Sequence, residues 1–166
     1  REISTLNEII YLLPRRFLGI SSRIRTQPEK LIHPHFPPMK ILVAEDNPIN
    51  QAVIRDFLKH FKLDCSVVSN GKEALDEMQQ ASFDLLFLDI QMPVMNGIET
   101  LTALKKADLL KDTFVVALTA YILDIQNNEM MQSNCDAFLS KPFEKVNLLE
   151  ILQKAADKYE SKTNKT

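Results

Sequence analysis

The sequence has no tryptophan, only three glycines and only two cysteines among its 166 residues. Cys65 and Cys135 are too few for a disulfide framework, so we expect two reduced thiols in a cytosolic protein. The three glycines are not clustered, which argues against a glycine-rich phosphate-binding loop of the Walker type. The chemistry must therefore come from other residue types.

The sequence also lacks a charge excess and a long apolar run. Its formal net charge of -2 suggests no bulk attraction to nucleic acid or to an anionic membrane. The apolar stretch over residues 9–13 ends at Pro14, far short of a membrane span. The chain does not begin with methionine, so we expect a piece of a larger protein, and a membrane-attached parent is compatible with that.

Short apolar runs alternate with longer amphipathic stretches from residue 40 onward. Asn47 and Pro48 are typical of a helix start, and Asn134 suits the left-handed position that often follows a helix. Nearly continuous apolar strands indicate a sheet covered by helices on both faces. We predict an α/β fold, a doubly wound five-stranded parallel sheet, with strands over 40–44, 65–69, 84–89, 113–119 and 137–140, and helices over 48–61, 72–81, 98–107, 122–133 and 144–159.

Polar side chains follow four of the five predicted strands. In a doubly wound parallel sheet, functional groups collect beyond the carboxyl ends of the strands. Each such residue alone is more often a helix cap or a solvated surface residue, and the joint pattern is the stronger signal. The residues expected at this edge are Glu45 and Asp46 after the first strand, Asp89, Thr119, and Lys141 after the last strand.

Three carboxylates brought close together repel one another unless a cation lies among them. Mg²⁺ prefers oxygen ligands and keeps several waters, which leaves room for a phosphoryl oxygen. Lys141 adds a second positive charge, and Thr119 adds a hydroxyl. We interpret this set as equipment for phosphoryl transfer, in which positioning and charge neutralisation do most of the catalysis and a carboxylate accepts the phosphoryl group.

Four motifs, in this order, resemble the receiver domain of two-component response regulators. The first contains Glu-Asp-Asn-Pro-x-Asn and looks most like receivers attached to hybrid sensor histidine kinases. The resemblance covers residues 39 to about 158 and implies a flavodoxin-like sheet with strand order 2-1-3-4-5. The motifs are Ile41-Leu-Val-Ala-Glu-Asp-Asn-Pro-Ile-Asn50, Leu88-Asp-Ile-Gln-Met-Pro-Val-Met-Asn-Gly97, Ala117-Leu-Thr-Ala120 and Phe138-Leu-Ser-Lys-Pro-Phe143.

The resemblance implies a role for each residue of the edge. Asp89 would accept a phosphoryl group from a histidine kinase or a histidine-phosphotransfer domain. Mg²⁺ would be held by Asp89, by Glu45 and Asp46 directly or through water, and by the backbone carbonyl of Gln91. The domain would catalyse its own phosphorylation and dephosphorylation, without binding nucleic acid directly.

The remaining implied roles concern the activated state. Thr119 would bond the phosphoryl group after activation, Lys141 would pair with it, and the Lys141–Pro142 bond would be cis. Phe138 stands at the rotating aromatic position, where tyrosine is frequent. The surface formed by residues 122–133, 137–140 and 144–159 would change on phosphorylation.

Some positions depart from the most frequent residues of the family. Asn96 replaces a frequent aspartate, and Asn134 replaces a frequent glycine. Gln91 and Tyr121, each two residues after a site residue, lie at positions that tune phosphoryl lifetime in the family. We hypothesise that their bulk hinders water from reaching the acyl-phosphate.

We expect three segments along the chain. Residues 1–38 comprise a helical segment and a proline-rich linker, residues 39–160 the receiver domain, and residues 161–166 a disordered tail. The first segment has the apolar spacing of the helix over 144–159, which suggests a remnant of a preceding receiver-like domain. Any amphipathic helix would match about as well.

Two other functions remain open at this point. The chain could be an interaction module that keeps the fold without being phosphorylated, although the full set of acids, threonine and lysine argues against this. It could also be an enzyme on a similar fold. An aspartyl phosphatase usually has a second aspartate where Gln91 stands, and acidic Glu45 and Asp46 have the wrong charge for a flavin phosphate.

Overall fold

A computed structural model describes residues 34–121 and 128–164 of the chain. The chain divides into two units, Arg1–His35 and Phe36–Thr166, and the second contains every helix and strand discussed below. The expected N-terminal helical segment lies outside the described residues, as do residues 122–127.

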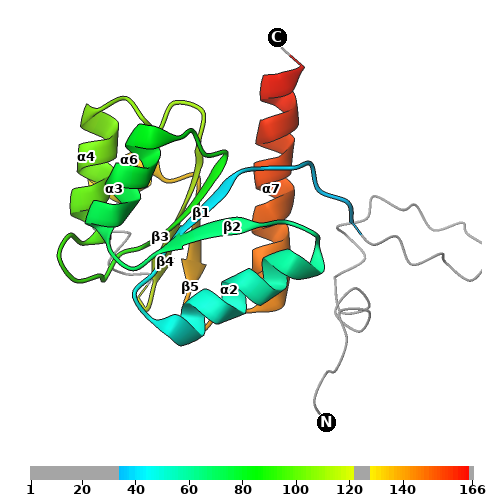
Figure 1. Ribbon diagram of the computed structural model, residues 1–166, viewed down its shortest axis with the longest axis horizontal. Coiled ribbons are helices and arrows are strands. Elements are labelled where there is room, and N and C mark those ends of the chain that lie inside the picture. The colour runs from blue at the N-terminus through cyan, green and yellow to red at the C-terminus, as the bar shows by residue number, and fades with distance from the viewer. Residues whose placement is uncertain (1–33, 122–127, 165–166) are drawn as a thin grey trace, which may run out of the picture. The chain divides into compact units, whose positions relative to one another are not determined.

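Five parallel strands form one sheet in the order β2-β1-β3-β4-β5, as predicted (Figure 1). The central strand β3 is buried along its whole length because helices cover both faces of the sheet. The strands are β1 Ile41–Ala44, β2 Cys65–Val68, β3 Leu85–Asp89, β4 Phe114–Thr119 and β5 Ala137–Ser140.

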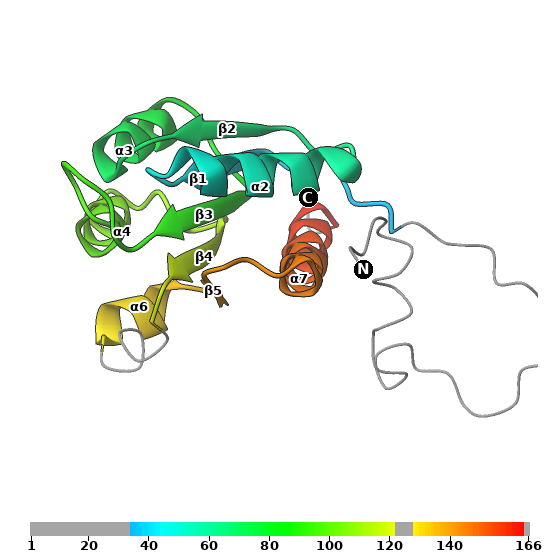
Figure 2. The ribbon, with the colours of Figure 1, turned by 90° about the horizontal axis from the view of Figure 1, so that it is seen from below.

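Helices α3, α4 and α6 lie on one side of the sheet, and α2 and α7 lie on the other (Figure 2). Alternate residues of each strand face opposite sides. Leu86 and Leu88 of β3 accordingly belong to the core packed against α3 and α4. The helices are α2 Pro48–His60, α3 Gly71–Gln80, α4 Gly97–Lys106, α6 Glu129–Asn134 and α7 Lys145–Thr163.

Asn47 caps α2 as predicted, since its side chain accepts hydrogen bonds from the backbone N–H groups of Ile49 and Asn50. The prediction for Asn134 was wrong. Asn134 is the last residue of α6, and Cys135 after it has an extended conformation with a φ of -102°. The side-chain amide of Asn134 donates to the backbone oxygen of Met130 at 2.8 Å, so the side chain bonds to a carbonyl of its own helix.

Helix α7 continues to Thr163, so residues 161–163 are helical rather than part of a disordered tail. No proline or glycine stops the helix after Tyr159. Lys162 lies 3.6 Å from Asp84 at the far end of the sheet, and a lysine near a helix C-terminus interacts favourably with the helix dipole.

Both cysteines are free thiols. Burial, together with neighbouring Asp136, raises the pKa of Cys135 to about 12, so this thiol stays protonated at neutral pH. Within residues 34–121 and 128–164, no helix combines the length and apolarity that crossing a bilayer requires.

Candidate functional site

The carboxyl ends of β1 and β3 bring three acidic side chains together. Strand β1 pairs with β3, and the register places Ala44 beside Leu88. Glu45 and Asp89, the residues that follow in each strand, therefore lie next to each other. One carboxylate oxygen from each of Glu45, Asp46 and Asp89 lies within 4.8 Å of the others, with Glu45 and Asp89 buried and Asp46 exposed.

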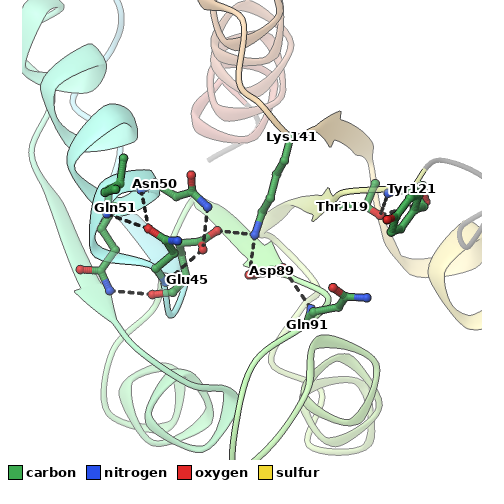
Figure 3. A network of polar contacts seen from close by, with 10 residues as sticks. Glu45, Asn50, Gln51, Asp89, Gln91, Thr119, Tyr121 and Lys141 are labelled. Carbon is green, nitrogen blue, oxygen red and sulfur yellow. Dashed lines mark hydrogen bonds and ion pairs between the residues drawn. The ribbon is translucent and has the colours of Figure 1, made fainter.

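Lys141 reaches into this cluster from the loop after β5 (Figure 3). Its Nζ lies 2.6 Å from Asp89 Oδ2 and 2.8 Å from Glu45 Oε2. Burial opposes the charged form of Lys141, but the close contacts with the carboxylates of Asp89 and Glu45 outweigh burial and raise its pKa. The Lys141–Pro142 peptide bond is cis, as expected.

Both carboxylate oxygens of Asp89 have donors. Oδ2 accepts from Lys141, and Oδ1 accepts from the backbone N–H of Gln91 at 3.0 Å. Burial raises the pKa of Asp89, and the charge of Glu45 adds to this, while the bonds from Lys141 and Gln91 act against it. The side chain of Gln91 is exposed and extends away from Asp89 (Figure 3).

Two asparagines at the start of α2 hold the Glu45 carboxylate, and the sequence analysis gave neither of them this role. Glu45 Oε1 accepts from the backbone N–H of Asn47 at 3.1 Å and from the side-chain amide of Asn50 at 3.0 Å. The next residue, Gln51, donates to the backbone oxygen of Glu45 at 2.6 Å. Asn50 is the last residue of the Glu-Asp-Asn-Pro-x-Asn motif, and this motif was the sequence signal from which its role could have been predicted.

Thr119 ends β4 as predicted, but its hydroxyl is turned toward Tyr121 (Figure 3). The hydroxyl donates to the backbone oxygen of Tyr121 at 2.9 Å and accepts from the backbone N–H of Tyr121 at 3.0 Å. Thr119 is buried, whereas the Tyr121 side chain is exposed. Phe138 on β5 is 39% exposed, so its ring lies at the surface rather than beneath Thr119.

Gly97, at the start of α4, packs closely against the carboxyl end of β3. A Cβ atom at this position would lie 2.3 Å from the backbone oxygen of Asp89. The N–H of Gly97 donates to the backbone oxygen of Ile90 at 3.0 Å. Only a residue without a side chain allows α4 to approach the end of β3 this closely.

The donor set fits a hard divalent cation. All candidate side-chain ligands are carboxylate oxygens, and three carboxylates with one ammonium give a formal charge of -2. Glu45 Oε2 is buried and makes no hydrogen bond in the part of the chain that the structure describes, although Lys141 Nζ lies 2.8 Å away. This oxygen therefore has lone pairs left for a metal ion.

The chain matches the family model for the response regulator receiver domain over residues 41–153. Among curated proteins, it is 31% identical to the polar-differentiation response regulator DivK of Brucella anthropi, over 70% of this chain and 94% of DivK. It is 34% identical to the osmosensing histidine protein kinase SLN1 of Saccharomyces cerevisiae, over 76% of this chain and 11% of SLN1. The chain thus spans nearly all of DivK but only a small part of SLN1.

Two solved structures resemble the fold closely. The receiver domain of the sensor histidine kinase PA1611 from Pseudomonas aeruginosa, with a magnesium ion in its active-site cleft, matches with a TM-score of 0.66 at 27% identity, over 73% of this chain and 99% of that one. The receiver domain of the Saccharomyces cerevisiae response regulator Ssk1, crystallised with the histidine phosphotransfer protein Ypd1, matches with a TM-score of 0.66 at 28% identity, over 73% and 90%. Together with the family model, these likenesses show that the chain belongs to the receiver-domain family of response regulators.

Proposed function

We propose that this receiver domain takes a phosphoryl group from a phosphohistidine onto Asp89 in a Mg²⁺-dependent reaction. The observation that carries the proposal is the surroundings of Asp89. Its carboxylate is buried, lies 2.6 Å from Lys141 Nζ, and shares the sheet edge with Glu45 and Asp46. A carboxylate in this setting is positioned as a nucleophile with cationic charge beside it.

In the transfer, a carboxylate oxygen of Asp89 forms a bond to phosphorus, and the P–N bond of the phosphohistidine breaks. The electron pair of that bond stays on the imidazole nitrogen, which takes up a proton from solvent. Lys141 lies close enough to Asp89 Oδ2 to neutralise phosphoryl oxygens in the transition state. The later hydrolysis breaks the bond between phosphorus and Asp89, and the phosphoryl group passes to water.

Glu45, Asp46 and Asp89, with the backbone carbonyl of Gln91, would hold the Mg²⁺ ion. The ion supplies positive charge to the phosphoryl oxygens and relieves the repulsion among the three carboxylates. The buried Oε2 of Glu45 supports this assignment, because it has no hydrogen bond of its own in the described residues.

The test of this function is labelling by a phosphodonor with and without Mg²⁺. We expect the wild-type chain to be labelled only with Mg²⁺, and Asp89→Asn to lose the label, because the amide is not a nucleophile. Persistent labelling of Asp89→Asn would place the acceptor elsewhere. A wild-type chain that neither becomes labelled nor binds beryllofluoride with Mg²⁺ would instead be an interaction module that is not phosphorylated.

The proposed donor is a protein, either a histidine kinase or a histidine-phosphotransfer domain. Ile49 and Val53, four residues apart on one face of α2, are 73% and 41% exposed. Val94, in the loop after Asp89, is 82% exposed. Exposed apolar residues on the elements that flank an acceptor suit docking of a protein partner. The structure of Ssk1 with Ypd1 supports a partner of this class.

The position of this domain in a larger protein is also part of the proposal. The relatives include both separate response regulators and hybrid kinases. We place the receiver in a cytoplasmic part of a hybrid histidine kinase, where Asp89 is one stop in a phosphorelay. The receiver unit runs from buried Phe36 to the end of α7 at Thr163.

Phosphorylation of Asp89 would act on the surface formed by α6, β5 and α7. A groove of about 640 Å³ lies between these elements and is lined by Phe138, Ser140 and Ile151 among others. Reorientation of Thr119 from Tyr121 toward the phosphoryl group would free space behind β4, into which the Phe138 ring can turn. The groove would change shape as a result.

We also propose that Gln91 and Tyr121 set how long Asp89 holds the phosphoryl group. Both side chains are exposed: Gln91 is two residues after the acceptor, and Tyr121 lies beside Thr119 (Figure 3). We expect Gln91→Ala and Tyr121→Ala to lose phosphoryl groups faster than wild type, because water reaches the acyl-phosphate more easily. Decay of the label after removal of donor measures this, and unchanged rates in both variants would refute the role.

A further inference from the structure

The two carboxylate oxygens of Glu45 have different kinds of partner. Oε1 accepts two hydrogen bonds from neutral donors, the Asn47 backbone N–H and the Asn50 amide. Oε2 faces Lys141 and has no hydrogen bond in the described part of the chain. One oxygen is thus fixed in place while the other stays available to a cation.

Asn50 is the only side chain among these donors, and its position follows from the start of α2. Asn47 caps the helix, Pro48 is the first helical residue, and Asn50 is the third. A side chain at the third position points back toward the residues before the helix, as the glutamate of a capping box does. Here the amide reaches past the cap to Glu45 instead, over five residues of sequence.

We propose that Asn50 is a positioning residue for the metal site, acting through Glu45. The inference rests on the proposed function, because it assumes that Glu45 takes part in binding Mg²⁺. Without the Asn50 amide, the Glu45 carboxylate keeps one neutral donor to Oε1 and gains rotational freedom. Oε2 then has to be ordered when the metal binds, so the affinity for Mg²⁺ falls.

Gln51 offers a matched control on the same helix. It also donates one amide hydrogen bond to Glu45, but to the backbone oxygen, at 2.6 Å. Removing the Gln51 amide takes the same kind of interaction from the same residue and leaves the carboxylate contacts in place. A general loss of packing around Glu45 would affect both variants, whereas loss of carboxylate positioning affects only Asn50→Ala.

The experiment is a titration of the full chain with MgCl₂, in which isothermal calorimetry measures the affinity for Mg²⁺. We expect Asn50→Ala to bind Mg²⁺ roughly 10- to 100-fold more weakly than wild type, as is typical when an outer partner of a metal ligand is removed. Gln51→Ala should bind as wild type does. If Asn50→Ala does not fold, Asn50→Ser, whose hydroxyl is too short to reach Oε1, carries the same expectation.

A second measurement distinguishes positioning from damage. In labelling by acetyl phosphate, Asn50→Ala should need more Mg²⁺ for half-maximal rate and recover nearly the wild-type rate at saturating Mg²⁺. Equal Mg²⁺ affinities of wild type and Asn50→Ala would overturn the inference and leave the proposed function intact. A wild-type chain that binds no Mg²⁺ would overturn both.

Discussion

At the scale of single residues, Val94 combines two features that seldom occur together. Its φ of 68° lies in the left-handed region, and Met95 N–H donates to Pro93 O across it at 2.7 Å, which closes a three-residue turn. A β-branched residue is strained in this conformation. Its side chain is nevertheless 82% exposed and buries little apolar surface in return. A strained, exposed valine beside an acceptor is consistent with selection for contact with a partner.

We predict that Val94→Gly raises the free energy of unfolding by about 1 kcal/mol, because relief of strain exceeds the added backbone entropy of glycine. Val53→Gly should lower it by about 1 kcal/mol, because Val53 lies inside helix α2. Urea unfolding followed by circular dichroism suits a chain without tryptophan.

The same variant separates docking from chemistry. Val94→Gly should slow phosphoryl transfer from a protein donor and leave labelling by acetyl phosphate unchanged. If Val94→Gly were no more stable than wild type, Val94 would not be strained. If its rate of phosphoryl transfer from the protein donor were unchanged, Val94 would not contact the donor.

At the scale of elements, three helices begin with an asparagine cap, and two of these caps, at α2 and α4, adjoin the site. Helices α2, α3 and α4 each begin after an asparagine, Asn47, Asn70 and Asn96, whose side chain accepts from the third residue of the helix. At α4, Glu99 completes a capping box by accepting from the Asn96 N–H at 2.9 Å. The next residue, Gly97, joins this capped start of α4 to the end of β3, because its N–H donates to the backbone oxygen of Ile90 at 3.0 Å.

Gly97→Ala tests how closely α4 must approach Asp89. The new methyl group would meet the Asp89 backbone oxygen at 2.3 Å, so helix and strand must separate. We expect the free energy of unfolding to fall by about 2 kcal/mol, in the range of overpacked cores. The rate of labelling by acetyl phosphate should also fall, because Asp89 moves.

A control for Gly97→Ala lies on the same helix. Lys105→Ala changes an exposed residue in the last turn of α4 and should leave both quantities near wild type. Wild-type labelling by Gly97→Ala would show that the site tolerates displacement of α4.

At the scale of the whole molecule, the compact unit begins before the first strand. Phe36 is buried and packs edge-on against Phe61, with ring centroids 5.2 Å apart, and Phe57 packs against Phe61 in turn. Met39 is buried as well. Phe36, which was expected to belong to the linker, therefore contributes its ring at the C-terminal end of α2, opposite the end that holds Asn50.

We predict that Phe36→Ala lowers the free energy of unfolding by about 3 kcal/mol, the usual loss for a buried phenylalanine. Pro38→Ala is the control, because Pro38 is exposed two residues away and should change stability by less than about 1 kcal/mol. Chemical unfolding of the full chain measures both. If the two variants were equally stable, Phe36 would not belong to the folded unit.

The sequence by itself determined the sheet and the residues gathered at its edge. Apolar runs of strand length alternating with amphipathic stretches leave few folds other than a parallel α/β sheet. In such a sheet the carboxyl ends of neighbouring strands coincide, so Glu45, Asp89 and Lys141 had to meet. Local capping was also predictable at Asn47, because it depends on only three following residues.

Only the tertiary structure decided how those residues are held. The bond from Asn50 to Glu45 and the turn of the Thr119 hydroxyl toward Tyr121 depend on side-chain rotamers. The burial of Phe36 depends on a contact with Phe61, more than twenty residues further along the chain. Rotamer choice decides the first two outcomes and long-range packing decides the third, and residue type and spacing carry no record of either.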